Sequence, residues 1–156
     1  MTKITKKIIY LIIFLMSALI LLSACENQNA AIPDDVDIDL INKVSARFDE
    51  IFLAYNEQRF EDYLSYYKID DEQKNLLLES LKANVELFTS KYEIRNVMAF
   101  TGDDGVISAT ILYYAISTDS DNKSTIVEET MYYKLTEENG NLFIASYESG
   151  PVTLVE

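Results

Sequence analysis

The sequence contains no histidine, no tryptophan, two prolines, four glycines and a single cysteine, Cys25. Without histidine, the chain has no Ser-His-Asp triad, no imidazole general base and no histidine metal ligand. One cysteine cannot form a disulfide within the chain or build a cysteine-rich zinc site. Any chemistry therefore depends on Asp, Glu, Tyr, Lys or Ser, and stability depends on a hydrophobic core.

Residues 1–24 have the composition of an export signal. Three lysines precede an apolar run from Ile8 to Leu22, and small residues follow it. This order is typical of a secretory signal peptide. The run is shorter than the roughly 20 residues that span a bilayer, which disfavours a permanent transmembrane helix. Its end, Leu22-Ser23-Ala24-Cys25, closely resembles the lipobox of bacterial lipoproteins.

The lipoprotein resemblance implies that Cys25 receives a diacylglycerol and that the chain is cut before it. Two acyl chains anchor a protein stably where one binds only marginally. The protein is then expected on the outer face of a bacterial cell membrane, with residues 25–36 as a lipidated, flexible tether. An uncleaved anchor or a plain secretory signal are the alternatives.

The chain after the signal is short and strongly acidic. It has 132 of the 156 residues, which suits one domain. It keeps 10 of the 13 basic residues against 26 acidic ones, a net charge of about −16. Such a chain repels nucleic acid, which is therefore not an expected partner. It could attract cationic peptides, polyamines or metal ions, or the charge could serve solubility alone.

Helical periodicity covers the first half of the domain, and an aspartate precedes each long helix as an N-cap. Asp70 and Gln73 resemble a capping box. The predicted helices run from Asp37 or Asp39 to about Asn56, from Phe60 to Tyr67, and from Asp70 to about Ser90. The apolar stripe expected on the last one is Leu77, Leu81, Val85 and Phe88.

Alternating patterns typical of strands cover the second half. Residues 106–118 are apolar on both faces in their middle, which predicts a central strand. Asn139-Gly140 predicts a tight hairpin turn, and Gly150-Pro151 ends the last strand, leaving residues 150–156 as a tail or an edge strand. The predicted strands are Tyr92–Phe100, Val106–Thr118, Ser124–Thr136 and Asn141–Glu148, with Tyr92, Ile94, Met98 and Phe100 sharing one face of the first.

Three helices followed by antiparallel strands predict a single α+β domain over residues 37–149. The helix junction Ala54–Leu64, the strand Tyr133–Leu135 and the hairpin through Asn139-Gly140 to Ser146 resemble the nuclear-transport-factor-2-like superfamily, also called cystatin-like. The resemblance implies a cone, with three helices packed on a curved antiparallel sheet of about four strands. That superfamily includes ketosteroid isomerase and dehydratases, which use Asp and Tyr, and many binding modules. No catalytic pair matches residue by residue, so no catalytic residue is assigned.

Glu129 is the carboxylate that the pattern singles out. It shares the more apolar face of its strand with Val127, Met131, Tyr133 and Leu135, and burial raises the pKa of a carboxyl group. Tyr113 on the neighbouring strand could supply a phenol. Tyr113, Glu129 and Tyr133 are therefore the pocket candidates. Alternatively, Glu129 reaches solvent or pairs with Arg95.

Two further patterns have competing interpretations. The tyrosine pairs Tyr66-Tyr67, Tyr113-Tyr114 and Tyr132-Tyr133 indicate either an aromatic-lined pocket or contact surface, or a tyrosine-rich core. Asp119-Ser120-Asp121-Asn122 resembles a calcium loop but lacks its glycine and final acidic residue, so a solvated hairpin is preferred. No metal and no cofactor is predicted.

The sequence thus favours a membrane-anchored binding or accessory module of the cell envelope over an enzyme. Its partners would be the membrane, through the lipid on Cys25, and an envelope protein, a peptide or a small ligand. The alternatives are a small pocket enzyme that uses a carboxylate with tyrosine, an immunity or exclusion lipoprotein that binds a cationic peptide, and a homodimeric envelope scaffold.

Overall fold

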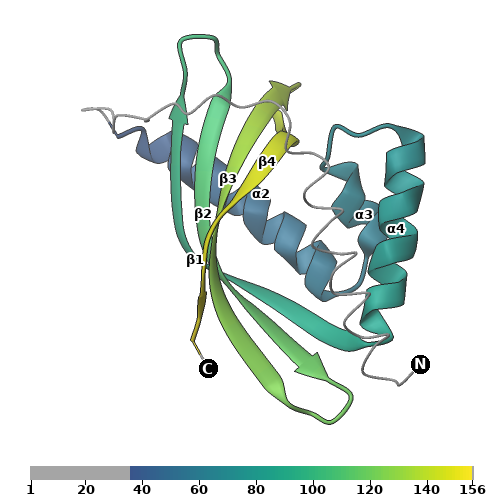
Figure 1. The fold of residues 1–156 in the computed structure, drawn as a ribbon. Helices are drawn as coiled ribbons and strands as arrows, with labels where there is room; N and C mark the ends of the chain where they lie inside the picture. Colours follow the sequence, from purple (N-terminus) through teal and green to yellow (C-terminus); the bar gives the residue numbers. More distant parts are fainter. Residues whose placement is uncertain (1–35, 156) are drawn as a thin grey trace. The chain divides into compact units, whose positions relative to one another are not determined.

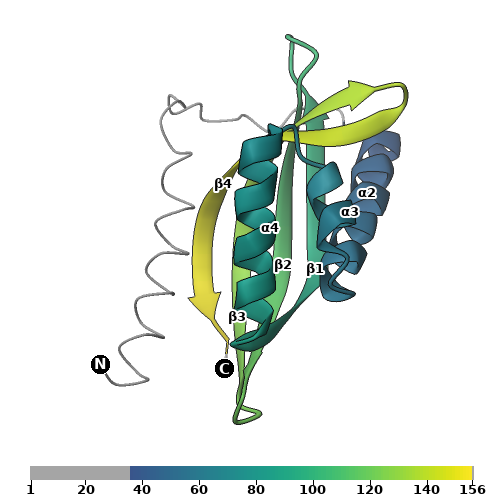
Figure 2. The same cartoon turned by 90° about the vertical axis from the view of Figure 1, so that its right-hand side faces the viewer.

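The computed structural model describes residues 36–155, and the predicted signal peptide, the lipobox, Cys25 and most of the tether lie outside the described residues. Three helices precede one antiparallel sheet in the order β1-β2-β3-β4, which is the α+β architecture predicted. Figures 1 and 2 show the helices over one face of the curved sheet. The elements are α2 (Ile38–Asn56), α3 (Phe60–Ser65), α4 (Asp71–Val85), β1 (Phe88–Thr101), β2 (Ile107–Asp119), β3 (Ser124–Glu138) and β4 (Asn141–Leu154).

Helix α2 packs its buried side chains against the sheet. Its N-cap is Asp37, whose carboxylate accepts a hydrogen bond from the Leu40 amide at 2.9 Å. One face carries the buried residues, as the spacing predicts, and the opposite face is charged. The buried residues of α2 are Val44, Phe48, Ile51, Phe52 and Ala54.

Helix α4 begins as predicted and ends earlier. The capping box of Asp70 and Gln73 is present. The helix ends at Val85, so the prediction to Ser90 is wrong, and Phe88 belongs to β1 rather than to the helical stripe. The reason is that residues 88–92 pair with β2 in regular register. No residue of α4 is fully buried, and within residues 36–155 no helix is long and apolar enough to cross a bilayer.

A β-bulge in β1 changes which side chains face the core. Ile94 pairs with Tyr113 and Asn96 with Leu112, so Arg95 is the extra residue. A one-residue shift exchanges the two faces of a strand. Val97 and Ala99 therefore face the core, and Met98, predicted on the same face as Tyr92, is 52% exposed.

Strands β2 and β3 occupy the centre of the sheet, as the apolar pattern of β2 predicts. The β3–β4 turn at Asn139-Gly140 has positive φ at both residues, the geometry of a tight hairpin. Strand β4 does not end before Gly150 but continues to Leu154, with Val152 opposite Glu129. Gly150 permits this, because a Cβ there would lie 2.7 Å from the Tyr132 ring.

The hydrophobic core lies between α2 and the inner, concave face of the sheet. Alternate residues of β2 are buried and form the floor of this core. The fully buried side chains with the largest volumes are Phe48, Ile51, Ile111, Leu135, Leu142, Ile144 and Val44. Residues 66–68 add a short parallel bridge to β4, through Lys68 N–H to Ile144 O at 2.8 Å.

Candidate functional site

Seven tyrosines gather on the concave face, from α2, α3, the segment after α3 and all four strands. Their rings form one connected set with centroid separations of 4.6–6.2 Å. Phe52 joins the set through Tyr92 and Tyr113. We call this set the tyrosine cluster, and its members are Tyr55, Tyr63, Tyr67, Tyr92, Tyr113, Tyr133 and Tyr147.

The hydroxyl groups of the cluster are held neutral. Burial raises the pKa of all seven phenols above the ordinary value of 10.0, because the protein interior disfavours a phenolate. The hydroxyls of Tyr63 and Tyr67 share a hydrogen bond of 2.7 Å. The rings of Tyr55 and Tyr92 pack with their centroids 4.6 Å apart. At neutral pH the cluster thus presents ring faces and neutral hydroxyl groups.

Glu129 is the carboxylate within this cluster. It pairs directly with Tyr113 across β2 and β3, so both side chains project from the concave face. After burial, the negative charge of Glu129 is the next cause that raises the pKa of Tyr113, and it also acts on Tyr92 and Tyr133. Glu129 therefore lies close to phenols from three strands.

Part of the cluster keeps access to solvent. Tyr63, Tyr67, Tyr92, Tyr147 and Glu129 are half-buried rather than fully buried. Directly opposite Glu129, β4 presents Val152, which is 58% exposed, and the next inward position of β4 is Leu154, 68% exposed. Glu129 thus lies beside an exposed apolar stretch of β4.

The outer, convex face of the sheet repeats the same pair of residue types. Tyr114 pairs with Glu128, one position along from Tyr113 and Glu129, so the second pair projects from the opposite face. There the guanidinium of Arg95 lies over the Tyr114 ring, 4.8 Å from its centroid. Arg95 follows Ile94, which packs on the core, so alternation along β1 places Arg95 on the convex face. It therefore does not pair with Glu129, which was the alternative that the sequence left open.

Asn56 fixes the position of Tyr92. Its side chain accepts a hydrogen bond from the Tyr92 N–H at 2.8 Å and donates one to the Tyr92 carbonyl at 3.0 Å. The asparagine at the end of α2 thus satisfies both backbone groups of an edge-strand residue, as a neighbouring strand would. This contact ties β1 to α2 beside the cluster.

A second concave region lies at the surface, between α2 and the β3–β4 turn. It has a volume of about 200 Å³ and is lined by Lys43, Ala46, Arg47, Glu50, Gly140 and Leu142. Its charges are already paired: Lys43 with Glu137 at 2.6 Å, and Arg47 with Glu50 at 2.7 Å. We interpret this region as a structural contact that holds α2 against the β3–β4 hairpin.

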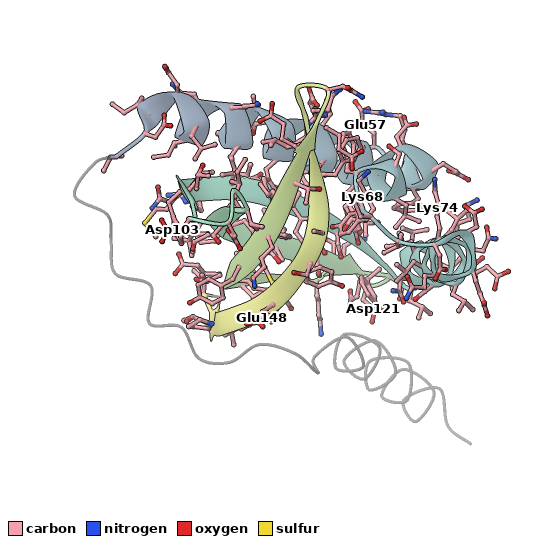
Figure 3. All side chains as sticks on the ribbon, turned by 90° about the horizontal axis from the view of Figure 1, so that it is seen from above. Glu57, Lys68, Lys74, Asp103, Asp121 and Glu148 are labelled. Carbon is pink, nitrogen blue, oxygen red and sulfur yellow. The ribbon has the colours of Figure 1, made fainter. Side chains whose placement is uncertain are left out.

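The loop with the calcium-like sequence is a hairpin connection. The carboxylate of Asp119 accepts hydrogen bonds from the amides of Asp121 and Lys123 at 2.9 and 3.0 Å. Asp121 in this turn and Asp103 in the β1–β2 turn lie at opposite ends of the sheet (Figure 3). Across residues 36–155, no group of three or more acidic or cysteine side chains is arranged to hold a metal ion.

The structure brings together all three pocket candidates, Tyr113, Glu129 and Tyr133, on the concave face. Of the other five tyrosines, the sequence pointed to Tyr67, through the pair Tyr66-Tyr67, and Tyr55, Tyr63, Tyr92 and Tyr147 were missed. The four-residue spacing of Tyr63 and Tyr67, which places both on one side of a helix, was a usable signal. The contribution of Tyr147 depends on the register of β4 and had no local signal.

Comparisons with known proteins agree on the fold. No family model matches the chain, and no curated protein is similar to it in sequence. Among solved structures, Aln2 from a Streptomyces species superposes with a TM-score of 0.62 at 11% identity, covering 77% of this chain and 94% of that one. An uncharacterized protein with a cystatin-like fold from Caulobacter vibrioides gives 0.55 at 14% identity, over 74% and 89%. The fold is cystatin-like.

A third cystatin-like neighbour extends the same conclusion. ActVI-ORFA from Streptomyces coelicolor superposes with a TM-score of 0.54 at 17% identity, covering 75% of this chain and 96% of that one. At such identities the cystatin-like likeness establishes the architecture, and function has to be argued from the residues of the cluster.

Proposed function

We propose that the protein is a bacterial lipoprotein, held by Cys25 on the outer face of the membrane, whose cystatin-like domain binds a small ligand without transforming it. The lipobox Leu22-Ser23-Ala24-Cys25 supports the anchoring. The observation that carries the binding function is the half-buried tyrosine cluster around Glu129. Tyrosine offers rigid apolar area with a polar end, which suits recognition of a small molecule.

Binding is favoured over catalysis by the state of the phenols. A tyrosine whose pKa lies above 10 stays protonated at neutral pH, so the cluster supplies hydrogen-bond donors and acceptors but no phenolate base. Glu129 is the carboxyl side chain that lies beside these phenols. A single carboxylate among neutral groups orients a ligand, whereas acid–base chemistry usually needs two groups with separated pKa values.

One observation favours a second candidate, a small pocket enzyme. Glu129 and Tyr113 lie side by side on paired strands. In that arrangement a carboxylate could accept a proton from a substrate while the neutral phenol stabilises the charge that develops. The fate of the bound ligand separates the two functions: recovery of the ligand unchanged supports binding alone, and turnover that Glu129→Gln abolishes supports the enzyme.

Two measurements test the proposed function. Cells expressing the full chain are labelled with an alkyne-bearing fatty acid, and label on the wild type but not on Cys25→Ser is expected. The full-length protein in a maltoside detergent is then exposed to fractions of a small-molecule extract from its own cells, with tyrosine fluorescence as the readout. Absence of label contradicts the anchoring, and absence of any active fraction contradicts the binding function.

A further inference from the structure

The inference concerns the charge of the ligand, and it rests on the binding function proposed above. The sheet presents two tyrosine–glutamate pairs of identical composition at consecutive positions, Tyr114–Glu128 outside and Tyr113–Glu129 inside. The outer pair has a cation from its own chain, because the Arg95 guanidinium lies 4.8 Å from the Tyr114 ring centroid.

The inner pair has no such cation. Neither glutamate takes part in an ion pair formed within residues 36–155, so the difference lies at the rings: a cation lies over Tyr114 and none lies over Tyr113. The neighbours of Glu129 are instead phenols, which carry no positive charge. A half-buried carboxylate among neutral groups attracts a ligand that brings a positive charge.

The rings around Glu129 are arranged to receive such a charge. Tyr92 and Tyr113 pack edge to face, with ring centroids 5.4 Å apart and an interplanar angle of 87°. Phe52 makes a second T-shaped contact with Tyr113 at 5.3 Å. Ring faces attract an ammonium group electrostatically, and aromatic walls combined with a carboxylate are the chemistry that recognises alkylated ammonium ions.

We propose that the tyrosine cluster binds an organic ammonium compound, with its cationic nitrogen between Glu129 and the rings of Tyr92 and Tyr113. The exposed Val152 and Leu154 on the neighbouring strand β4 contact the apolar substituents of that nitrogen. The strongly acidic composition of the chain draws cations toward the domain and repels anions. An ammonium group of this kind occurs both in free amines and in lipid headgroups.

The test uses the full-length protein in a maltoside detergent, which carries no ammonium group. Because the chain has no tryptophan, its intrinsic fluorescence comes from eleven tyrosines, of which seven belong to the cluster. Titrations compare choline with its neutral isostere 3,3-dimethylbutan-1-ol. We expect choline to bind at least about tenfold more tightly. Equal or tighter binding of the neutral alcohol overturns the proposal, and this comparison needs no variant.

Two variants then test which carboxylate attracts the positive charge of the ligand. Glu129→Gln should weaken choline binding at least about tenfold and leave the alcohol unaffected. Glu128→Gln, the same change one residue away on the convex face, should leave both unchanged. Equal loss in the two variants would show a general field effect and overturn the assignment to Glu129.

The source of the ammonium group is resolved by a third ligand. Dihexanoylphosphocholine below its micellar concentration carries the choline group with a neighbouring phosphate. Binding as tight as that of choline identifies a lipid headgroup, and weaker binding identifies a free amine. If no ammonium compound binds while an extract fraction still does, this inference fails and the binding function stands.

Discussion

The two faces of the sheet carry the same tyrosine–glutamate pair, but they differ in whether a cation of the chain lies over the tyrosine ring. On the convex face, a tyrosine, a glutamate and Arg95 lie together, so the chain supplies both signs of charge. On the concave face, a tyrosine and a glutamate lie among further tyrosines with no cation from residues 36–155. Strand alternation alone thus places one copy of a repeated residue pair beside a cation of the chain and the other copy among neutral phenols.

The largest effect expected from this difference is unfolding in alkali. A phenol whose folded-state pKa lies above its unfolded value of about 10 stabilises the fold below pH 10, and this contribution is lost as the pH rises through the folded-state pKa. The clustered tyrosines should therefore ionise together with unfolding. Parallel changes in phenolate absorbance and circular dichroism above pH 10 check this. Ionisation of all tyrosines with the fold intact would contradict the burial of the cluster.

The next largest effect is expected from truncating two consecutive residues of β2, one on each face of the sheet. Ile111 is fully buried on the concave side, whereas Leu112 is half-buried on the convex side. Ile111→Ala should lower the free energy of unfolding by about 2–5 kcal/mol, because it leaves a cavity in the core. Leu112→Ala should cost about 1 kcal/mol, since it loses only partial burial. Urea denaturation measures both, and equal losses would argue against a one-sided core.

A smaller effect tests how the concave face is held in place. Asn56→Ala removes both side-chain hydrogen bonds to the Tyr92 backbone, and we expect a loss of about 1–3 kcal/mol in the free energy of unfolding. Asn96→Ala, at an exposed position of the same strand, should change it by no more than about 0.5 kcal/mol. If the two variants are equally stable, the edge of β1 does not depend on Asn56.

The fold could be predicted largely because its signals are local. A capping aspartate and a glycine with positive φ act within a few residues, so the start of α4 at Asp70 and the turn at Asn139-Gly140 follow from the sequence. The inward direction of Glu129 follows from alternation along one strand. These predictions needed no knowledge of which elements lie side by side.

The rest depended on pairing between distant segments. The bulge at Arg95 has no glycine or proline to mark it, and it arises from how β1 meets β2. The tyrosine cluster likewise assembles from helices and strands far apart in the chain, such as Tyr63 and Tyr147. The early end of α4 has the same origin, because Phe88 pairs with Asp119 in the sheet instead of extending the helix.

The smallest effect sharpens the comparison between the two glutamates. Arg95→Met removes the cation above Tyr114 and should lower the free energy of unfolding by about 0.5–1 kcal/mol. Glu129→Gln removes a carboxylate that has no cationic partner within residues 36–155, so stability should stay the same or rise. Chemical denaturation of both variants measures this. A clear loss of stability in Glu129→Gln would mean that the carboxylate is needed for folding. A gain would mean that the chain keeps Glu129 at a cost to stability, which is expected of a residue retained for its ligand.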